Sequence, residues 1–478
     1  MAVIQQLKPS EKALLKNLFE KTHPLPKLLA TVRSRRVGRG YSIEPGVEQI
    51  HAATGHRLFA KAGPLQFVSK KDPIALTELE EAVLAWSAGG PNGLIAWDIG
   101  VHTGGGGKEF SSAAGLNVPS PGNDAVHAAY TFIVNDNGVH MYKPGPERSK
   151  PVELEDEKDY DKIMKWYRGS TKRILNKRPD ISWATRAPGA PNATLFGPYQ
   201  YNLNKPGSSW FIPVYDCAWL MLGMMASIFA DWHLYFIDDQ TKKPAGLDKW
   251  IKPGMLEFPL TISGIEWFFF QVEQYPVGCM LQNLRLVSEG MGLGTWSFCG
   301  YFDDVLMGAF PSIAKGFQMQ STTNDKVPST GSTQVLGIPG VLEATRIPGL
   351  KYKTPEEAVK GMYETRYTRG GVLAKEDNYM LKSGGPYKAD VIKTVVNHPD
   401  EQIDDWVLEA IKAYLHYCID KYGQWPINFN PLQAQFSATV HHIDEEFYEK
   451  YYARGYITEQ IRDHFKNWHP GERNQNNH

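Results

Sequence analysis

The segment 276–300 has the clearest periodic pattern of apolar and polar positions in the chain. Apolar side chains recur at i, i+3, i+4 and i+7 spacing along Val277, Met280, Leu281, Leu284, Val287 and Met291. This spacing predicts a helix with one apolar face. Gly292 and Gly294 are expected to end the helix, and Thr295 to Phe298 has the composition of a short strand.

Other segments show similar patterns. Residues 77–88 and 403–418 read as amphipathic helices, and residues 219–237 read as a buried helix followed by a strand. A Pro-Ser-Pro-Gly-Asn turn at residues 119–123 leads into an apolar, aromatic run to Val134, which predicts a strand. Residues 1–30 are expected to form a helical lead. Residues 319–349 are rich in Gly, Pro, Ser and Thr, which favours a linker.

Composition narrows the class of protein. The chain has 478 residues, 42% of them hydrophobic and 22% charged, which predicts a soluble protein of two or three domains. A formal net charge of −1 argues against a nucleic-acid partner. Asp231 and His233 interrupt the most apolar run, so no membrane span is expected.

The cysteines and the N-terminal sequence indicate the cellular compartment in which the protein is expected. The four cysteines lie far apart with no CxxC pair, which argues against a zinc or disulfide framework. The N-terminal residues lack the pattern of a signal peptide. We therefore expect a cytoplasmic protein.

An arginine-rich segment lies at Ser34–Tyr41, with the sequence SRRVGRGY. Arg35, Arg36 and Arg39 lie beside two glycines. Guanidinium groups suit phosphate oxygens and the electron-rich edge of a flavin, and glycines let the backbone approach a ligand closely. A solvated basic loop is the alternative interpretation of this segment alone.

These segments together resemble the FMN-dependent nitroreductase-like superfamily, and most closely its azoline-oxidising branch. The family's Arg-Arg-Ser-x-Arg-x-aromatic motif is similar to residues 35–41, and its Pro-Ser-x-Gly-Asn turn is similar to residues 119–123. Gly138 to Tyr142 resembles the Gly-x-x-x-Tyr hairpin of that branch. Gln282 to Leu286, followed by Gly292 to Gly294, resembles the family's closing helix.

The resemblance implies a fold and a set of cofactor contacts. It implies an α+β sandwich with a mainly antiparallel sheet covered by helices, binding FMN at the interface of a homodimer. The implied domains are a lead at 1–30, an FMN-binding domain at 31–345 and a mainly helical C-terminal extension at 350–478. The implied cofactor-binding residues are Arg35, Arg36, Val37, Arg39, Pro119, Ser120, Gly122, Asn123, Gly294, Cys299 and Gly300.

Two positions depart from the family pattern, and one role stays open. Val37 replaces a serine that contacts the flavin, and Cys299 lies near a position often held by an acidic or small residue. Lys315 and Arg346 are alternative candidates for binding the flavin phosphate.

The implied activity is an FMN-dependent oxidoreductase that moves a hydride through flavin N5, to or from a small or peptide-linked substrate. Nitro or quinone reduction and heterocycle dehydrogenation are separate sub-cases. No GxGxxG fingerprint follows a strand, so NAD(P)H would act only as a transient donor. The catalytic acid or base is not identifiable from the sequence.

Two alternatives belong to other classes. The chain could keep the fold as a flavin-free binding or scaffold subunit, which the Val37 departure favours. It could also be a metal-dependent hydrolase built on His441, His442 and Asp444. Adjacent histidines diverge on a helix or a strand, so no metal site is predicted there.

Overall fold

The computed structural model describes residues 24–43, 47–50, 57–60, 64–90, 129–142, 161–179, 203–311, 314–368, 402–453 and 456–469, with 374–376 and a few single residues up to 399. The predicted turn at 119–123, and with it Pro119, Ser120, Gly122 and Asn123, lies outside these residues.

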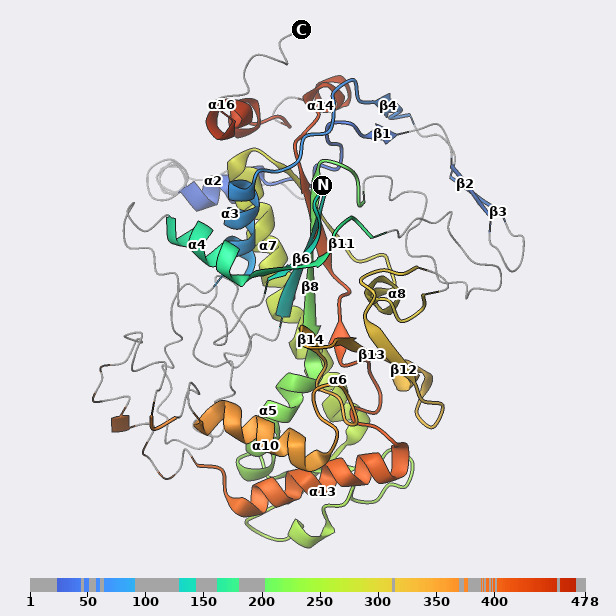
Figure 1. The fold of residues 1–478 in the computed structure, drawn as a ribbon, viewed down its shortest axis with the longest axis vertical. Helices are drawn as coiled ribbons and strands as arrows, with labels where there is room; N and C mark the ends of the chain where they lie inside the picture. The colour runs from blue at the N-terminus through green and yellow to red at the C-terminus, as the bar shows by residue number, and fades with distance from the viewer. Residues whose placement is uncertain are drawn as a thin grey trace, which may run out of the picture.

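A seven-stranded antiparallel sheet forms the centre of the molecule (Figure 1), with the order β11-β16-β8-β5-β6-β7 and β15 also paired to β8. Its strands are β5 (Ala129–Asn135), β6 (Gly138–Tyr142), β7 (Thr171–Leu175), β8 (Ser208–Asp216), β11 (Gly294–Phe298), β15 (Leu432–Gln433) and β16 (Ser437–His441). The expectation of a mixed helix and strand fold with an antiparallel sheet is confirmed at this level.

Strand β8 is buried along its whole length because both faces of the sheet are covered. Phe211 and Tyr215 point into a core shared with the helices, while Trp210, Ile212 and Val214 point into a second core. This is the period-two alternation of a strand between two layers.

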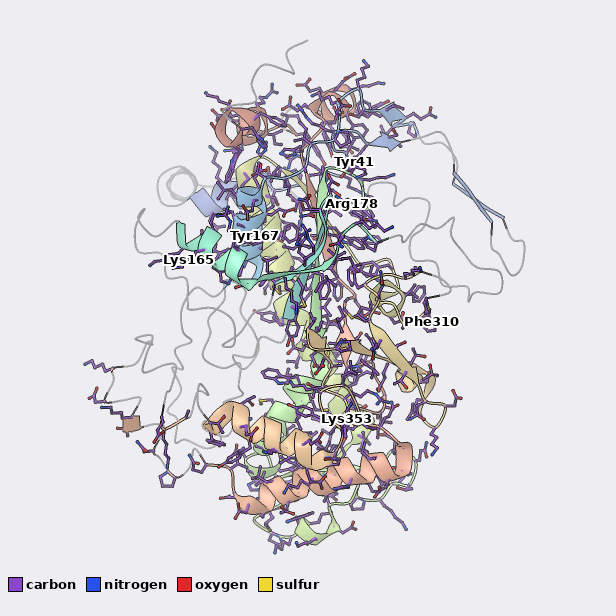
Figure 2. The ribbon with its side chains drawn as sticks, viewed as in Figure 1. Tyr41, Lys165, Tyr167, Arg178, Phe310 and Lys353 are labelled. Carbon is purple, nitrogen blue, oxygen red and sulfur yellow. The ribbon has the colours of Figure 1, made fainter. Side chains whose placement is uncertain are left out.

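Helices cover the first face. They are α3 (Glu78–Gly89), α4 (Asp161–Ser170), α5 (Cys217–Ala230) and α7 (Gln274–Met291). Helix α3 packs on both α7 and α4. The hydroxyl of Tyr167 on α4, labelled in Figure 2, donates to Glu81 of α3 at 3.1 Å. The predicted helices at 77–88 and 276–291 are therefore confirmed, as is the helix and strand pair at 219–237, which is α5 followed by β9 (Leu234–Ile237).

The second face is covered by α8 (Asp303–Met307) and a three-stranded antiparallel sheet. The strands are β12 (Gln320–Thr323), β13 (Thr333–Ile338) and β14 (Leu342–Glu343), with the short helix α9 (Ser329–Ser332) between the first two. The prediction of a linker at 319–349 is wrong. Val335 and Leu342 anchor these short strands in the second core, although β12 itself consists of the polar residues Gln320–Thr323.

The lower end in Figure 1 contains α10 (Pro355–Tyr367) and α13 (Asp405–Tyr422), which pack on α5. Helix α13 confirms the helix predicted at 403–418. Also outside the main sheet are α6 (Ile262–Val272), the 3-10 turn η5 (Asp248–Trp250) and β10 (Phe258–Thr261), which pairs in parallel with β9.

The upper end joins segments from both ends of the chain (Figure 1). N-terminal elements are α2 (Pro24–Thr31), β1 (Ser42–Ile43), β2 (Val47–Ile50), β3 (Arg57–Ala60) and β4 (Phe67–Val68). C-terminal elements are α14 (Glu445–Tyr451), α15 (Glu459–Arg462) and α16 (His464–Trp468). The arginine segment 34–41 lies here. Strand β16, from the predicted C-terminal extension, lies inside the main sheet between β11 and β8.

Candidate metal centre

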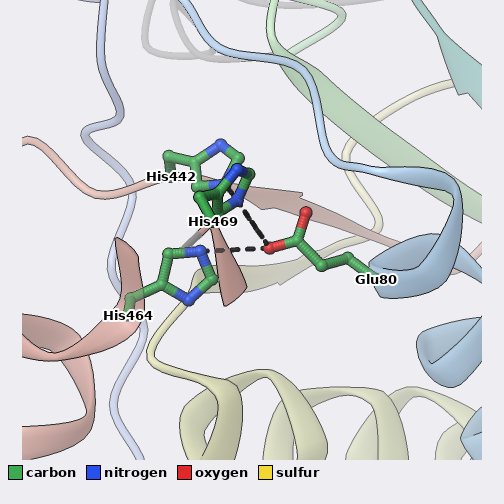
Figure 3. Close-up of side chains that lie close together, drawn as sticks. All are labelled: Glu80, His442, His464 and His469. Atoms are coloured by element: carbon green, nitrogen blue, oxygen red, sulfur yellow. Dashed lines mark hydrogen bonds and ion pairs between the residues drawn. The ribbon is translucent and has the colours of Figure 1, made fainter. Parts of the chain in front are cut away.

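Four buried side chains converge near the top of helix α3 (Figure 3). Glu80 comes from the first turn of α3, His442 directly follows β16, and His464 and His469 lie at the two ends of α16. Their exposed fractions are 0%, 1%, 2% and 5%, so bulk water does not solvate them. One donor atom from each lies within 4.8 Å of the other three.

A capping box holds the carboxylate of Glu80 in place. The Thr77 hydroxyl accepts the Glu80 backbone N–H, while Glu80 Oε2 accepts the Thr77 N–H at 2.6 Å and its hydroxyl at 2.9 Å. The other carboxylate oxygen, Oε1, is left to face the histidines. The local sequence of the helix start therefore orients one oxygen of this acid.

Three imidazole nitrogens surround that oxygen. Glu80 Oε1 lies 3.1 Å from His464 Nε2, 3.2 Å from His469 Nε2 and 3.6 Å from His442 Nε2. The Nε2 atoms of His442 and His469 are 3.3 Å apart. Donor atoms bound about 2.0–2.1 Å from a tetrahedral ion lie on the order of 3.3 Å from one another. The four distances given above lie between 3.1 and 3.6 Å, close to that value.

Backbone carbonyls determine which nitrogen of two histidines carries the proton. His442 Nδ1 lies 2.8 Å from the Ile74 carbonyl, and His464 Nδ1 lies 2.6 Å from the Met291 carbonyl. A carbonyl oxygen only accepts, so each Nδ1 must donate a proton. In a neutral ring the lone pair is then on Nε2, the atom that faces the Glu80 carboxylate. Lone pairs facing a carboxylate repel it unless a proton or a cation lies between them.

Electrostatics keep the Glu80 carboxylate ionised and disfavour a charged ring at His442. Burial would raise the pKa of Glu80, but hydrogen bonding and charge interactions with His442 and His464 hold it well below its usual range. Burial lowers the pKa of His442, which disfavours a charged ring. Three imidazoles and one carboxylate are suitable ligands for zinc and neighbouring transition metals. Histidine ligands whose other nitrogen binds a carbonyl are typical of such sites.

This set was not predicted from the sequence, where His442 was a candidate ligand but Glu80, His464 and His469 were not. Glu80 and His469 are 389 residues apart in the chain. The other histidine and acid considered there have different roles. The His441 ring fills the space between Gly38 and Gly294, and Asp444 accepts from Ser69 and caps α14. A second histidine pair in the same tail, five residues apart, was the available signal.

The structure brings the arginine segment and the 276–300 segment together. The Arg35 backbone N–H donates to the Thr295 carbonyl at 3.0 Å, and the Arg36 guanidinium lies 3.9 Å from the Trp296 ring centroid. Gly294 lies against His441. Cys299 and Gly300 lie exposed just beyond the other end of β11.

Several of these predicted flavin contacts are bonded within the chain. The Arg35 guanidinium is fully buried, paired with Glu289 and donating to the Tyr456 carbonyl. The Val37 N–H donates to the Tyr448 hydroxyl at 2.9 Å, and Arg39 lies buried 4.2 Å from the Phe465 ring centroid. In this conformation Arg35, Val37 and Arg39 are thus engaged by groups of the chain itself, and their role as flavin ligands stays a prediction.

The two candidates for the flavin phosphate also differ. Arg346 is buried and donates to Gln334 Oε1 at 2.5 Å and to Gln424 Oε1 at 3.3 Å, while Lys315 is exposed. Only Lys315 is therefore accessible to a ligand in this conformation.

Comparisons with known proteins do not assign a family. The sequence matches no protein-family model, and no curated protein matches it. The resemblance to nitroreductase-like proteins stays a prediction. In the described part of the chain, every helix is too short or too polar to cross a membrane.

Proposed function

We propose that this protein is a metalloprotein that binds one divalent transition-metal ion, with zinc the first candidate, through Glu80, His442, His464 and His469. The proposal depends mainly on the orientation of two rings. The Nδ1 atoms of His442 and His464 donate to backbone carbonyls, so their lone pairs meet the Glu80 carboxylate at one point. A cation at that point replaces repulsion with four coordinate bonds.

The ligand set supports a structural role for the ion. Four protein ligands complete a tetrahedral shell, whereas a hydrolytic zinc centre keeps one position for water. All four side chains are buried. The ion would join helix α3 to the end of β16 and to α16, which argues against the metal-dependent hydrolase considered from the sequence.

The test is elemental analysis of the untagged protein, followed by zinc titration of chelated protein. We expect about one zinc per chain, and we expect Glu80→Gln and His464→Ala to lose it. His416→Ala is the matched control, because His416 also contacts a glutamate, Glu356 at 2.6 Å, but on the surface. Protein that carries no metal and takes up neither zinc nor cobalt would refute the proposal.

A second candidate function is FMN-dependent oxidoreduction on a small or peptide-linked substrate, by a cytoplasmic homodimer with a nitroreductase-like sandwich fold. The observation that favours it is the meeting of the two resembling segments, through the Arg35 N–H to Thr295 bond and the Arg36 to Trp296 contact. FMN would supply the hydride chemistry, with NAD(P)H as a transient donor.

The absorption spectrum of the purified protein tests this second function, with any released cofactor identified by mass. Flavin bands and stoichiometric FMN would support it. A colourless protein that also fails to bind added FMN would favour the flavin-free subunit instead. The burial of Arg35 and Arg39 and the valine at position 37 support that alternative.

A further inference from the structure

Residues 443–453 and 456–469, here called the C-terminal cap, form a small core of their own with the N-terminal part of the chain. That core consists of Val37, Tyr41, Phe67, Ile443, Phe447, Tyr448 and Ile461. It is separate from the two cores that hold the main sheet. The cap is attached to the main body at α7, where α15 packs and His464 Nδ1 donates to the Met291 carbonyl, and at α3 through Glu80.

The cap covers two arginines of segment 34–41. Arg35 Nη2 donates to the Tyr456 carbonyl at 2.8 Å, and the Arg39 guanidinium lies over Phe465. Both arginines are buried, with 0% and 8% of their surface exposed. Burial lowers the pKa of Arg39, although the charges of Glu445 and Asp444 partly offset that effect. The charge of Arg35 is paired with Glu289 of α7, whereas Arg39 lies over Phe465 of the cap, so the cap must offset the cost of keeping Arg39 out of water.

The metal centre is in direct contact with this cover. Phe465 stacks on the His442 ring at 5.2 Å and lies 5.1 Å from the His469 ring. The Arg39 backbone N–H also donates to the His442 carbonyl at 3.0 Å. The residue that covers Arg39 is therefore packed between metal ligands. The position of Phe465 therefore depends on the positions of His442 and His469.

Without an ion, the attachment of the cap to α3 weakens. His464 and His469 reach the main body at this point through Glu80, and the His464 and His442 lone pairs face the same carboxylate. With an ion, these atoms are bonded to one centre, and α16 is tied to α3.

We propose that the metal ion is a latch: its occupancy holds the C-terminal cap over Arg35 and Arg39, and its loss uncovers both arginines. This inference rests on the proposed metal site. It assigns the ion control over the accessibility of a basic segment, which is a regulatory role beyond stabilising the fold.

The experiment compares the full-length protein carrying one zinc with the same protein after chelation. Hydrogen exchange and phenylglyoxal labelling of arginine are both read by peptide mass. On zinc removal we expect exchange in peptides 34–41 and 456–469 to rise about tenfold or more, with little change in residues 208–230 of β8 and α5. Labelling of Arg35 and Arg39 should rise in parallel.

A variant at Phe465 tests the cover over Arg39 without changing any of the four metal ligands. Phe465→Leu keeps all four ligands and should still bind one zinc, yet label faster at Arg39. Phe258→Leu, at an exposed position on β10, is the matched control. It should change neither zinc binding nor the labelling of Arg39. Unchanged Arg39 labelling in Phe465→Leu would overturn the coupling through the ring.

The outcomes distinguish the two proposals. If zinc binds stoichiometrically but its removal leaves the labelling of Arg35 and Arg39 unchanged, the latch is wrong and the metal site stands. If exchange rises equally in residues 208–230, the ion supports the whole fold and the latch is also wrong. If no zinc binds at all, both proposals fail.

Discussion

Arg35 and Glu289 form a fully buried ion pair that fastens the arginine segment to the last turn of helix α7. Breaking such a pair leaves an uncompensated charge in the interior. We expect Arg35→Met or Glu289→Gln to lower the free energy of unfolding by about 3–5 kcal/mol. Replacing both residues with apolar ones should lower the free energy of unfolding by clearly less than the sum of the two single effects.

Denaturant unfolding of the singles and the double variant measures this coupling. The exposed pair Arg168 and Glu78, 2.5 Å apart, is the control, and Arg168→Met should cost less than about 1 kcal/mol. Equal effects at both pairs would contradict a role for burial.

Gly278 inside helix α7 and Gly292 at its C-terminal cap should respond in opposite directions to alanine. Gly292 ends the helix at a φ of 83°, and a Cβ there would lie 2.2 Å from the Gln460 carbonyl oxygen. Gly292→Ala should destabilise by about 2 kcal/mol or more. Gly278 lies inside the helix with open space around its Cα. Gly278→Ala should stabilise by roughly 0.5–1 kcal/mol. Thermal melts of both variants would show whether the signs differ.

Thr77 should influence the metal centre without touching the ion. Its hydroxyl donates to Glu80 Oε2 and so orients the carboxylate. Thr77→Val should weaken zinc binding by about tenfold or more, as is typical for groups that orient metal ligands. Thr354 caps α10, where its hydroxyl accepts the Glu357 N–H at 3.3 Å, far from the site. Thr354→Val should cost a similar ~1 kcal/mol of stability while leaving zinc affinity unchanged. Competition titration with a chelating dye measures the affinity of each.

Glu273 should make stability fall as pH rises. Burial, reinforced by the nearby charge of Asp216, raises its pKa to about 8. The folded chain then holds a proton that the unfolded chain releases near its ordinary pKa. Its contribution is complete at low pH and is lost as the pH rises from that value through 8. Glu273→Gln should flatten this dependence by roughly 1 kcal/mol or more between pH 6 and 9. Parallel slopes for the two proteins would contradict the assigned pKa.

Local patterns predicted the helices well because their signals are short in range. The apolar spacing of Val277 to Met291 and the stop at Gly292 are visible without any partner, and α7 ends at Met291. The strands within 319–349 were not predicted because Val335 and Leu342 are buried against a face of the main sheet that is formed by segments distant in sequence. Turn-forming residues dominate the local composition there.

The candidate metal centre could not be assembled from local spacing, because the histidine pair His464 and His469 is only half of it. Glu80 reads as the second half of a capping box, and His464 and His469 read as polar residues of a short terminal helix. Only the pairing of β16 with β8 and β11 brings His442 above the start of α3. Long-range strand pairing, and not motif spacing, assembles this site.

The position of β16 also has a consequence for how the protein is made. During synthesis β8 and β11 leave the ribosome long before residue 437, yet β16 lies between them in the finished sheet. Until then, each of these two apolar strands presents an open edge to other chains. A nascent polypeptide stalled before residue 437 therefore exposes two strand edges on which other chains can aggregate. We expect the need for chaperones to be greatest between the synthesis of β11 and that of β16.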